Sequence, residues 1–122
     1  MDESKPFGVE YVPPGKRAKI VDGRVYAGKV TELPPGKAKA IALDKFSIAV
    51  FNVNGEFFAI KDACPHAEYP LSKGVVTGDE VTCSSHSWKF NIKSGQCTRG
   101  TEDLTIRTFK VVVEGDSLWI VI

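Results

Sequence analysis

The chain has 122 residues, of which 43% are hydrophobic and 25% are charged, which fits one globular domain. Its formal net charge of +1 gives no electrostatic reason to expect binding to nucleic acid or to an anionic membrane. No apolar run approaches the roughly 20 residues that cross a bilayer, and the acidic N-terminus MDESKPFGVE is not a secretory signal. We therefore expect a cytoplasmic protein, in which Cys/His clusters bind metal more often than they form disulfides.

The elements predicted along the chain are β-hairpins that follow an N-terminal arm. The run Phe46–Lys61 contains two β-rich segments around Asn54-Gly55, which is a strong hairpin signal. Three later runs repeat this design, with turns at Gly78-Asp79, at Ser94-Gly95 and around Glu114-Gly115-Asp116. No segment keeps a helical period over three turns. The sequence therefore predicts an all-β fold of small packed antiparallel sheets.

Both histidines of the chain and two of its three cysteines lie between residues 64 and 86. They form a C-x-H pair, Cys64 with His66, and a C-x-x-H pair, Cys83 with His86, and 16 residues separate the two pairs. Thiolates and imidazoles are good ligands for iron, zinc and copper. Because the intervening residues form a predicted hairpin, the two short loops can face each other and hold a binuclear site, with the cysteines on one iron and the histidines on the other.

This pattern resembles the Rieske family of [2Fe–2S] proteins. The segments AIKDACPH (Ala59–His66), YPLSKG (Tyr69–Gly74) and SWKFNIKSG (Ser87–Gly95) are similar to the strands and turns that flank the ligand loops in that family. The resemblance starts near Val25. It implies an arm over residues 1–24 and a Rieske domain over residues 25–122, in which two ligand loops form a cluster-binding subdomain at about residues 62–92.

The resemblance also implies one [2Fe–2S] cluster per chain, held by Cys64, His66, Cys83 and His86. Two neutral imidazoles in place of thiolates raise the reduction potential to the Rieske range of roughly −150 to +300 mV. High-potential relatives carry a serine and a tyrosine after the second histidine and a disulfide between the loops. In this chain Trp88 and Phe90, and Tyr69 and Ser85, stand at those positions. The expected potential is therefore in the lower half of the range.

Some positions depart from the family pattern. Glu68 and Ser87 replace two usual loop glycines, and RGTEDL (Arg99–Leu104) lacks the proline of the usual covering segment. Our hypothesis is that Glu68 and Glu102 lower the potential further or mark a cationic docking partner.

The remaining cysteine and the two tryptophans are interpreted as structural residues. Cys97 lies on the return strand of the third hairpin, where a buried and inert thiol is expected. Trp88 and Trp119 are predicted to be packing residues, and Trp88 also to cover the second ligand loop.

The function implied by the resemblance is that of a soluble one-electron carrier and not of an enzyme. A chain of this length has no room for the catalytic domain of Rieske oxygenases. The expected partners are a flavin-dependent reductase and a terminal oxygenase, which would dock where His66 and His86 are exposed, with Pro70, Leu71 and Trp88 around them.

Two other functions fit parts of the pattern. The small subunit of assimilatory nitrite reductases also resembles a Rieske domain, but it often lacks the full ligand set. A zinc-binding interaction module could use two thiolates and two imidazoles, although common zinc modules group Cys with Cys and His with His.

Overall fold

The computed structural model describes residues 17–64, 69–83, 87–100 and 104–122. These residues form ten β-strands and two short 3-10 helices, η3 (Val30–Glu32) and η4 (Leu71–Lys73), and they contain no α-helix. The prediction of an all-β fold is therefore confirmed. No helix in this part of the chain is long and apolar enough to cross a membrane.

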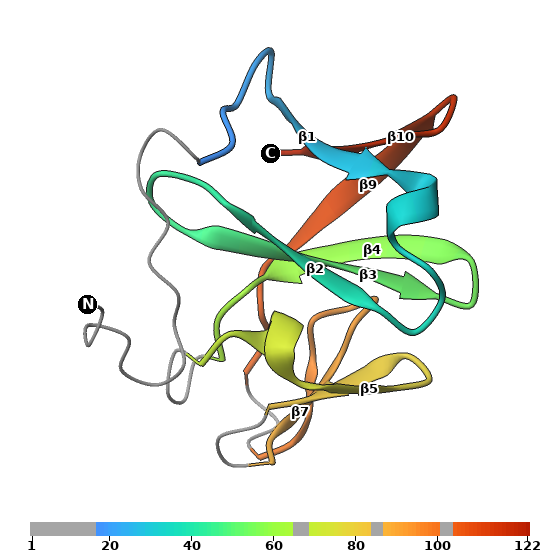
Figure 1. Cartoon of the computed structure of the whole chain (residues 1–122). Coiled ribbons are helices and arrows are strands. Elements are labelled where there is room, and N and C mark those ends of the chain that lie inside the picture. The colour runs from blue at the N-terminus through green and yellow to red at the C-terminus, as the bar shows by residue number, and fades with distance from the viewer. Residues whose placement is uncertain (1–16, 65–68, 84–86, 101–103) are drawn as a thin grey trace, which may run out of the picture.

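The strands form two antiparallel sheets, one above the other in Figure 1. The six-stranded sheet has the order β1 (Arg24–Lys29), β10 (Ser117–Val121), β9 (Thr108–Glu114), β4 (Glu56–Lys61), β3 (Ser47–Val53) and β2 (Ala38–Ala42). The four-stranded sheet has the order β5 (Val75–Thr77), β6 (Glu80–Thr82), β7 (Lys89–Asn91) and β8 (Cys97–Arg99).

All four predicted hairpins are present, and their turns have the backbone conformations that the sequence indicated. Asn54 and Gly55, between β3 and β4, have φ angles of 53° and 94°, which suit the tight turn that Asn-Gly favours. Gly78, Gly95 and Gly115 also have positive φ angles in the other three turns. Glycine adopts such angles without a steric penalty, which is why these turns were predictable.

Two hydrophobic cores share strand β3. The upper core lies inside the curled six-stranded sheet and includes Val25, Ile41, Ile48, Val50, Phe109, Leu118 and Ile120. The lower core lies between β3–β4 and the four-stranded sheet and includes Ala49, Phe51, Val53, Ile60, Leu71, Val81, Phe90 and Ile92. Because side chains alternate along a strand, β3 sends Ile48 and Val50 into one core and Ala49 and Phe51 into the other.

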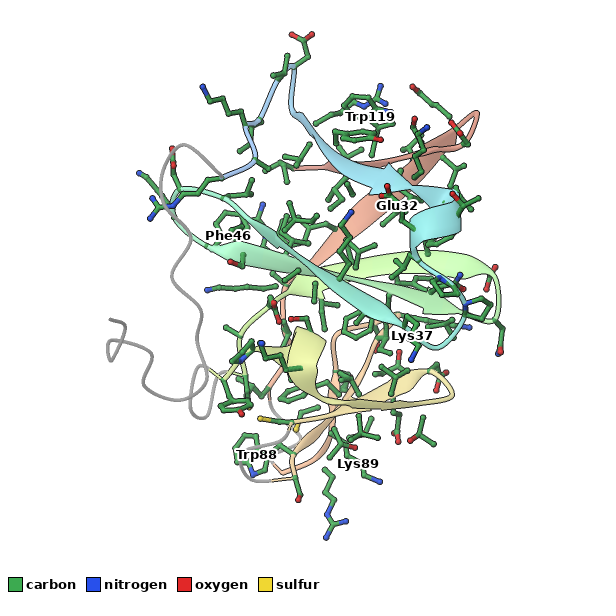
Figure 2. The ribbon with its side chains drawn as sticks, in the orientation of Figure 1. Glu32, Lys37, Phe46, Trp88, Lys89 and Trp119 are labelled. Atoms are coloured by element: carbon green, nitrogen blue, oxygen red, sulfur yellow. The ribbon has the colours of Figure 1, made fainter. Side chains whose placement is uncertain are left out.

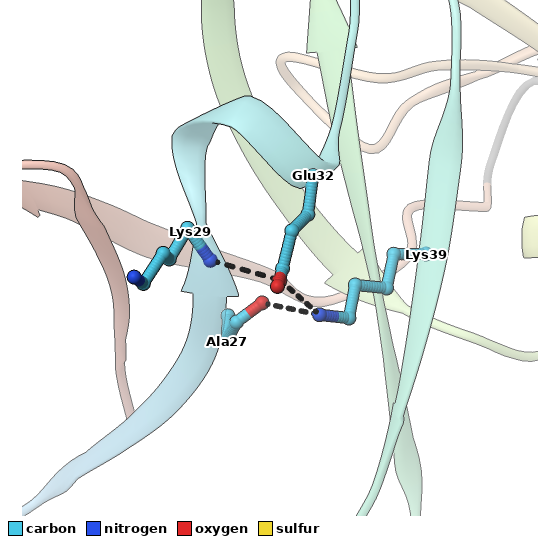
Figure 3. Close-up of polar contacts among 4 residues, drawn as sticks. All are labelled: Ala27, Lys29, Glu32 and Lys39. Carbon is cyan, nitrogen blue, oxygen red and sulfur yellow. Dashed lines mark hydrogen bonds and ion pairs between the residues drawn. The ribbon is translucent and has the colours of Figure 1, made fainter.

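A lysine side chain connects the two edge strands of the six-stranded sheet, β1 and β2 (Figure 3). Lys39 Nζ, on β2, donates to the Ala27 carbonyl on β1 at 3.0 Å and lies 3.5 Å from Glu32 Oε1. The same carboxylate accepts a hydrogen bond from the Lys29 amide at 3.0 Å, and this bond, followed by the charge of Lys39, lowers the pKa of Glu32. A bulge in the pairing of β1 with β10, between Tyr26 and Gly28, leaves the Ala27 carbonyl available.

The chain before β1 is described only from Arg17 onward. The Ala18 amide donates to Ala42 O at 2.8 Å, and Val21 pairs with Arg24 at the entry to β1. Residues 1–16 lie outside the described residues, so the extent of the N-terminal arm stays a prediction.

Gly28→Ala tests the contact between the edge strands. Gly28 has a φ of 104°, and an added Cβ would meet Lys39 Nζ and lie 2.6 Å from Glu32 Oε1. Both neighbours are ends of flexible side chains, so we expect them to move away and lose the bond to Ala27. The loss in free energy of unfolding should exceed that of Gly55→Ala by about 0.5–1.5 kcal/mol, the net value of a hydrogen bond.

Gly55→Ala is the matched control, because Gly55 also has a positive φ but has no atom near its added Cβ. In a Lys39→Met background the difference between the two alanine variants should disappear in urea denaturation. Equal losses in the wild-type background would contradict a stabilising role of the lysine contact.

Candidate metal centre

The first predicted ligand loop starts directly after strand β4. Cys64 follows β4 by three residues and has no exposed surface. Its amide N–H donates to Tyr69 O at 2.8 Å, which closes a six-residue loop. Pro70 then leads into η4, whose Leu71 is fully buried in the lower core.

The second predicted ligand loop has the same closure. Cys83 directly follows β6, is 1% exposed, and donates its amide N–H to Trp88 O at 2.7 Å. The Ser87 amide donates back to Cys83 O at 3.0 Å. Each loop therefore begins with a buried cysteine whose amide bonds to the carbonyl five residues later. This shared geometry was not evident from the sequence, because one pair is C-x-H and the other is C-x-x-H.

The two cysteines belong to one core and are not joined. Cys64 and Cys83 both lie in the lower core, and neither forms a disulfide. His66 and His86 lie outside the described residues, as do Glu68, Ser85 and Glu102. In the part of the chain that the structure describes, no three His, Cys, Asp or Glu side chains gather to hold a metal ion. The four-residue ligand set therefore stays a prediction, of which the structure describes the cysteine half.

The described residues fit an iron–sulfur cluster. Two soft sulfur donors on two similarly closed loops reach one water-poor region, as the thiolate-bound half of such a cluster requires. The absence of a disulfide between them leaves both thiols available as ligands.

Gly74 lets the exit of the first loop lie against the entry to the second. An added Cβ at this position would collide with the backbone carbonyl of Thr82 and lie 3.1 Å from Val81 Cγ2. A backbone carbonyl cannot move aside as a flexible side chain can, so the close approach of η4 to β6 requires glycine here. The sequence shows a glycine after the first loop but does not show what approaches it.

A buried aspartate fixes the first loop at its base. Asp62 is 8% exposed and accepts two hydrogen bonds from Ser72, one from the amide at 2.7 Å and one from the hydroxyl at 2.6 Å. Burial raises the pKa of Asp62, while the bonds from Ser72 oppose that shift. Because the pKa of Asp62 is raised in the folded state, binding of a proton to this carboxyl group stabilises the folded state at low pH. This stabilisation is lost as the pH rises from about 3.9, the usual pKa of an aspartate, through the pKa of Asp62 in the folded state. The sequence did not predict this hydrogen-bonded pair, because no local sequence pattern relates Asp62 to a residue ten positions later.

Trp88 packs at the end of the second loop and against a third segment. It is half-buried beside the lower core, and its indole ring lies over Gly100, where an added Cβ would be 2.7 Å from Cγ. Gly100 has a φ of 136°, a second reason for glycine at this position. The predicted packing role of Trp88 is confirmed. Phe90 is fully buried, and neither side chain offers a hydroxyl group.

The burial of Cys97 and a packing role of Trp119 are also confirmed, although Trp119 lies outside both cores. Cys97 lies on β8, is 2% exposed, and its Sγ donates to Arg99 O at 3.3 Å. Trp119 packs edge-on against Tyr26 with ring centroids 5.3 Å apart, and the Arg24 guanidinium lies 4.6 Å from the Trp119 ring. Figure 2 shows Trp119 and Trp88 at opposite ends of the molecule.

Comparisons with known proteins agree with this geometry. A family described as Rieske [2Fe-2S] domain matches residues 23–110. The chain is 39% identical over 90 residues to the biphenyl dioxygenase ferredoxin subunit of Pseudomonas sp. (strain KKS102), across 73% of this chain and 83% of that one. It is 40% identical over 100 residues to the 3-phenylpropionate/cinnamic acid dioxygenase ferredoxin subunit of Shigella boydii serotype 4 (strain Sb227), across 80% and 92% of the two chains. The solved ferredoxin of carbazole 1,9a-dioxygenase from Nocardioides aromaticivorans IC177 has a TM-score of 0.76 at 27% identity, covering 82% and 98%.

Asp62→Ala and Asp62→Asn should separate the hydrogen bonds of Asp62 from its charge. The alanine variant leaves the Ser72 amide without its acceptor, so we expect a loss of about 1–3 kcal/mol in the free energy of unfolding. The asparagine variant can accept from the amide and donate to the hydroxyl, so it should lose less. Urea denaturation measures both, and equal losses would contradict the hydrogen-bond role.

Ser87→Gly should stabilise the second loop. Ser87 has a φ of 62°, a left-handed conformation that costs a residue other than glycine about 1–2 kcal/mol. Part of this gain is offset by the greater freedom of glycine in the unfolded chain, so the expected net gain is up to about 1 kcal/mol. Ser87→Val is the matched comparison and should be destabilising. A glycine variant with a lower melting temperature than the wild type would refute this explanation.

Proposed function

This chain belongs to the Rieske [2Fe–2S] domain family, and we propose on that premise that it is a one-electron carrier that supplies a terminal oxygenase. The observation that carries the proposal is the pair of similarly closed loops, each starting with a buried cysteine that forms no disulfide and lies in one core. The similarity to the two ferredoxin subunits supports a carrier instead of an enzyme, because the match spans 83% and 92% of their lengths.

In this proposal the thiolates of Cys64 and Cys83 and the imidazoles of His66 and His86 would hold the cluster. When bound, a [2Fe–2S] cluster supplies the chemistry of accepting and releasing one electron. The chain contributes a buried environment for the sulfur ligands, and the loop closures and the Asp62–Ser72 bonds orient the loops. Phe90 and Trp88 give no hydroxyl hydrogen bonds to the cluster sulfurs, which supports a potential in the lower half of roughly −150 to +300 mV.

The electron-carrier proposal also implies redox partners and a cellular compartment. The proposed electron donor is a flavin-dependent reductase, and the proposed acceptor is the oxygenase. Both would dock on the end of the molecule that carries the two loops, where Tyr69, Pro70 and Trp88 are partly exposed. The expectation that Leu71 also lies on this face was wrong, because its side chain is fully buried in the lower core. Interfaces between electron-transfer proteins are small, typically below about 1,200 Å² of buried surface, so they form and separate quickly. The lack of a disulfide among the three cysteines supports a reducing compartment such as the cytoplasm.

The domain division is also part of the proposal. The electron-carrying domain extends over residues 25–122, with the cluster-binding part at about residues 62–92, and an N-terminal arm precedes it. The described strands, from β1 at Arg24 to β10, support this division.

Metal analysis and EPR spectroscopy of the purified holo-protein test the proposed function. We expect iron and acid-labile sulfide in the ratio of a [2Fe–2S] cluster, and a rhombic signal with a low average g value after reduction with dithionite. Cys64→Ser and Cys83→Ser should lose this signal, because a hydroxyl is a poor substitute for a thiolate ligand. Cys97→Ser is the control and should keep the signal.

Other outcomes would favour other functions. Zinc in place of iron would mean a zinc-binding module and would end the electron-transfer proposal. A signal of the all-thiolate type that Cys97→Ser removes would mean that Cys97 is a ligand. A large subunit that co-purifies in constant ratio would favour a subunit of a larger reductase.

A further inference from the structure

A row of outward-facing side chains borders the second ligand loop. Strand pairing aligns Val75 with Thr82, Thr82 with Lys89, and Lys89 with Arg99 across the four-stranded sheet. The neighbouring row, with Val81, Phe90 and Cys97, is buried in the lower core, so Thr82 and Lys89, which alternate with Val81 and Phe90, face outward and are half-buried. A bulge in the pairing of β7 with β8 interrupts the alternation after Cys97, and Arg99 is exposed. The residues next to this row along the chain are Cys83, Trp88 and Gly100. Figure 2 shows Lys89 beside Trp88 at that end of the molecule.

Lys89 and Arg99 place two positive charges directly opposite each other. Like charges at opposed positions of a β-sheet are destabilising, and among the described residues no carboxylate forms an ion pair with either side chain. The acidic residues of this sheet, Asp79 and Glu80, lie at the β5–β6 turn, at the other end of the strands.

Three cations elsewhere in the described residues pair with carboxylates. Arg24 pairs with Glu114 at 2.9 Å, Lys39 with Glu32 at 3.5 Å and Arg17 with Asp44 at 3.7 Å. Lys89 and Arg99 differ from those three cations in facing each other without a described carboxylate, next to the loop where electrons are proposed to leave. Because the juxtaposition of two like charges does not stabilise the sheet, it favours a role in recognition.

We propose that Lys89 and Arg99 form an electropositive docking patch whose occupant is an acidic surface of the electron-accepting oxygenase. This inference rests on the proposed function and names the charge of the partner. Complementary charge increases the rate of productive encounter more than the final affinity, which suits a transient carrier. The charge is opposite to the one that Glu68 and Glu102 suggested from the sequence, so the two readings predict partners of opposite sign.

Two inorganic oxidants of opposite charge test the patch. The reduced holo-protein is mixed in a stopped-flow instrument with ferricyanide, an anion, or with hexaamminecobalt(III), a cation. Lys89→Gln, Arg99→Gln and the double variant are compared with the wild type, and Lys110→Gln, on an exposed position of β9, is the control for loss of one charge. At low ionic strength the double variant should react roughly three- to tenfold more slowly with ferricyanide and faster with hexaamminecobalt(III).

The salt dependence and the direction of the two rate changes distinguish electrostatic steering from a change in the reduction potential of the cluster. A changed potential would shift both oxidation rates in the same direction, whereas a changed local field shifts them in opposite directions. The differences should shrink at about 0.5 M salt, where charges are screened over a few ångströms. The wild type alone should show a ferricyanide rate that falls with added salt, so the test does not depend on one variant folding.

Several outcomes would overturn the proposal. Rates like those of Lys110→Gln would show that the patch does not steer charged partners. A wild type that prefers the cationic oxidant would show that acidic residues dominate this surface and that the partner is basic. In both cases an intact EPR signal would leave the carrier function standing, whereas a protein without the cluster would overturn both proposals.

Discussion

The structure depends on the burial of β3 on both of its faces. One face of this strand packs in the upper core and the other in the lower core, so the strand is the wall that the two halves of the molecule share. Each fully buried side chain of this kind contributes about 1.5–3 kcal/mol through the hydrophobic effect. A strand buried on one face alone would hold only one of the two sheets. The double burial explains why its sequence is nearly continuous in apolar residues.

The position of the candidate metal centre follows from this wall. The chain leaves β3 through the Asn54-Gly55 turn, returns along β4 and delivers Cys64 into the lower core. The four-stranded sheet packs against the same core and delivers Cys83 from its other side. Gly74 permits the close approach of the two segments, and Asp62 holds the exit of the first loop. The loops are thus placed by packing, and their own hydrogen bonds only set their shape.

The arrangement of some charges differs between the two sheets. On the six-stranded sheet, Arg24 pairs with Glu114 and lies over the Trp119 ring, and Lys39 pairs with Glu32. Beside the second loop, Lys89 and Arg99 face each other with no described counter-charge. A carrier must bind and release two partners in turn. Surface charge serves that purpose better than a large apolar interface, because it accelerates encounter without adding much affinity.

The sequence by itself determined the hairpins, the all-β class and the candidate ligands, because each depends on neighbours in the chain. Asn54-Gly55 specifies its turn through local backbone sterics, and the Cys/His spacing is visible in one dimension. Only the tertiary structure decided which residues meet across long separations. The bonds from Ser72 to Asp62, the indole of Trp88 over Gly100, and Lys39 on the Ala27 carbonyl all depend on register and topology. No local pattern encodes those contacts, since they arise from the packing of two sheets on a common strand.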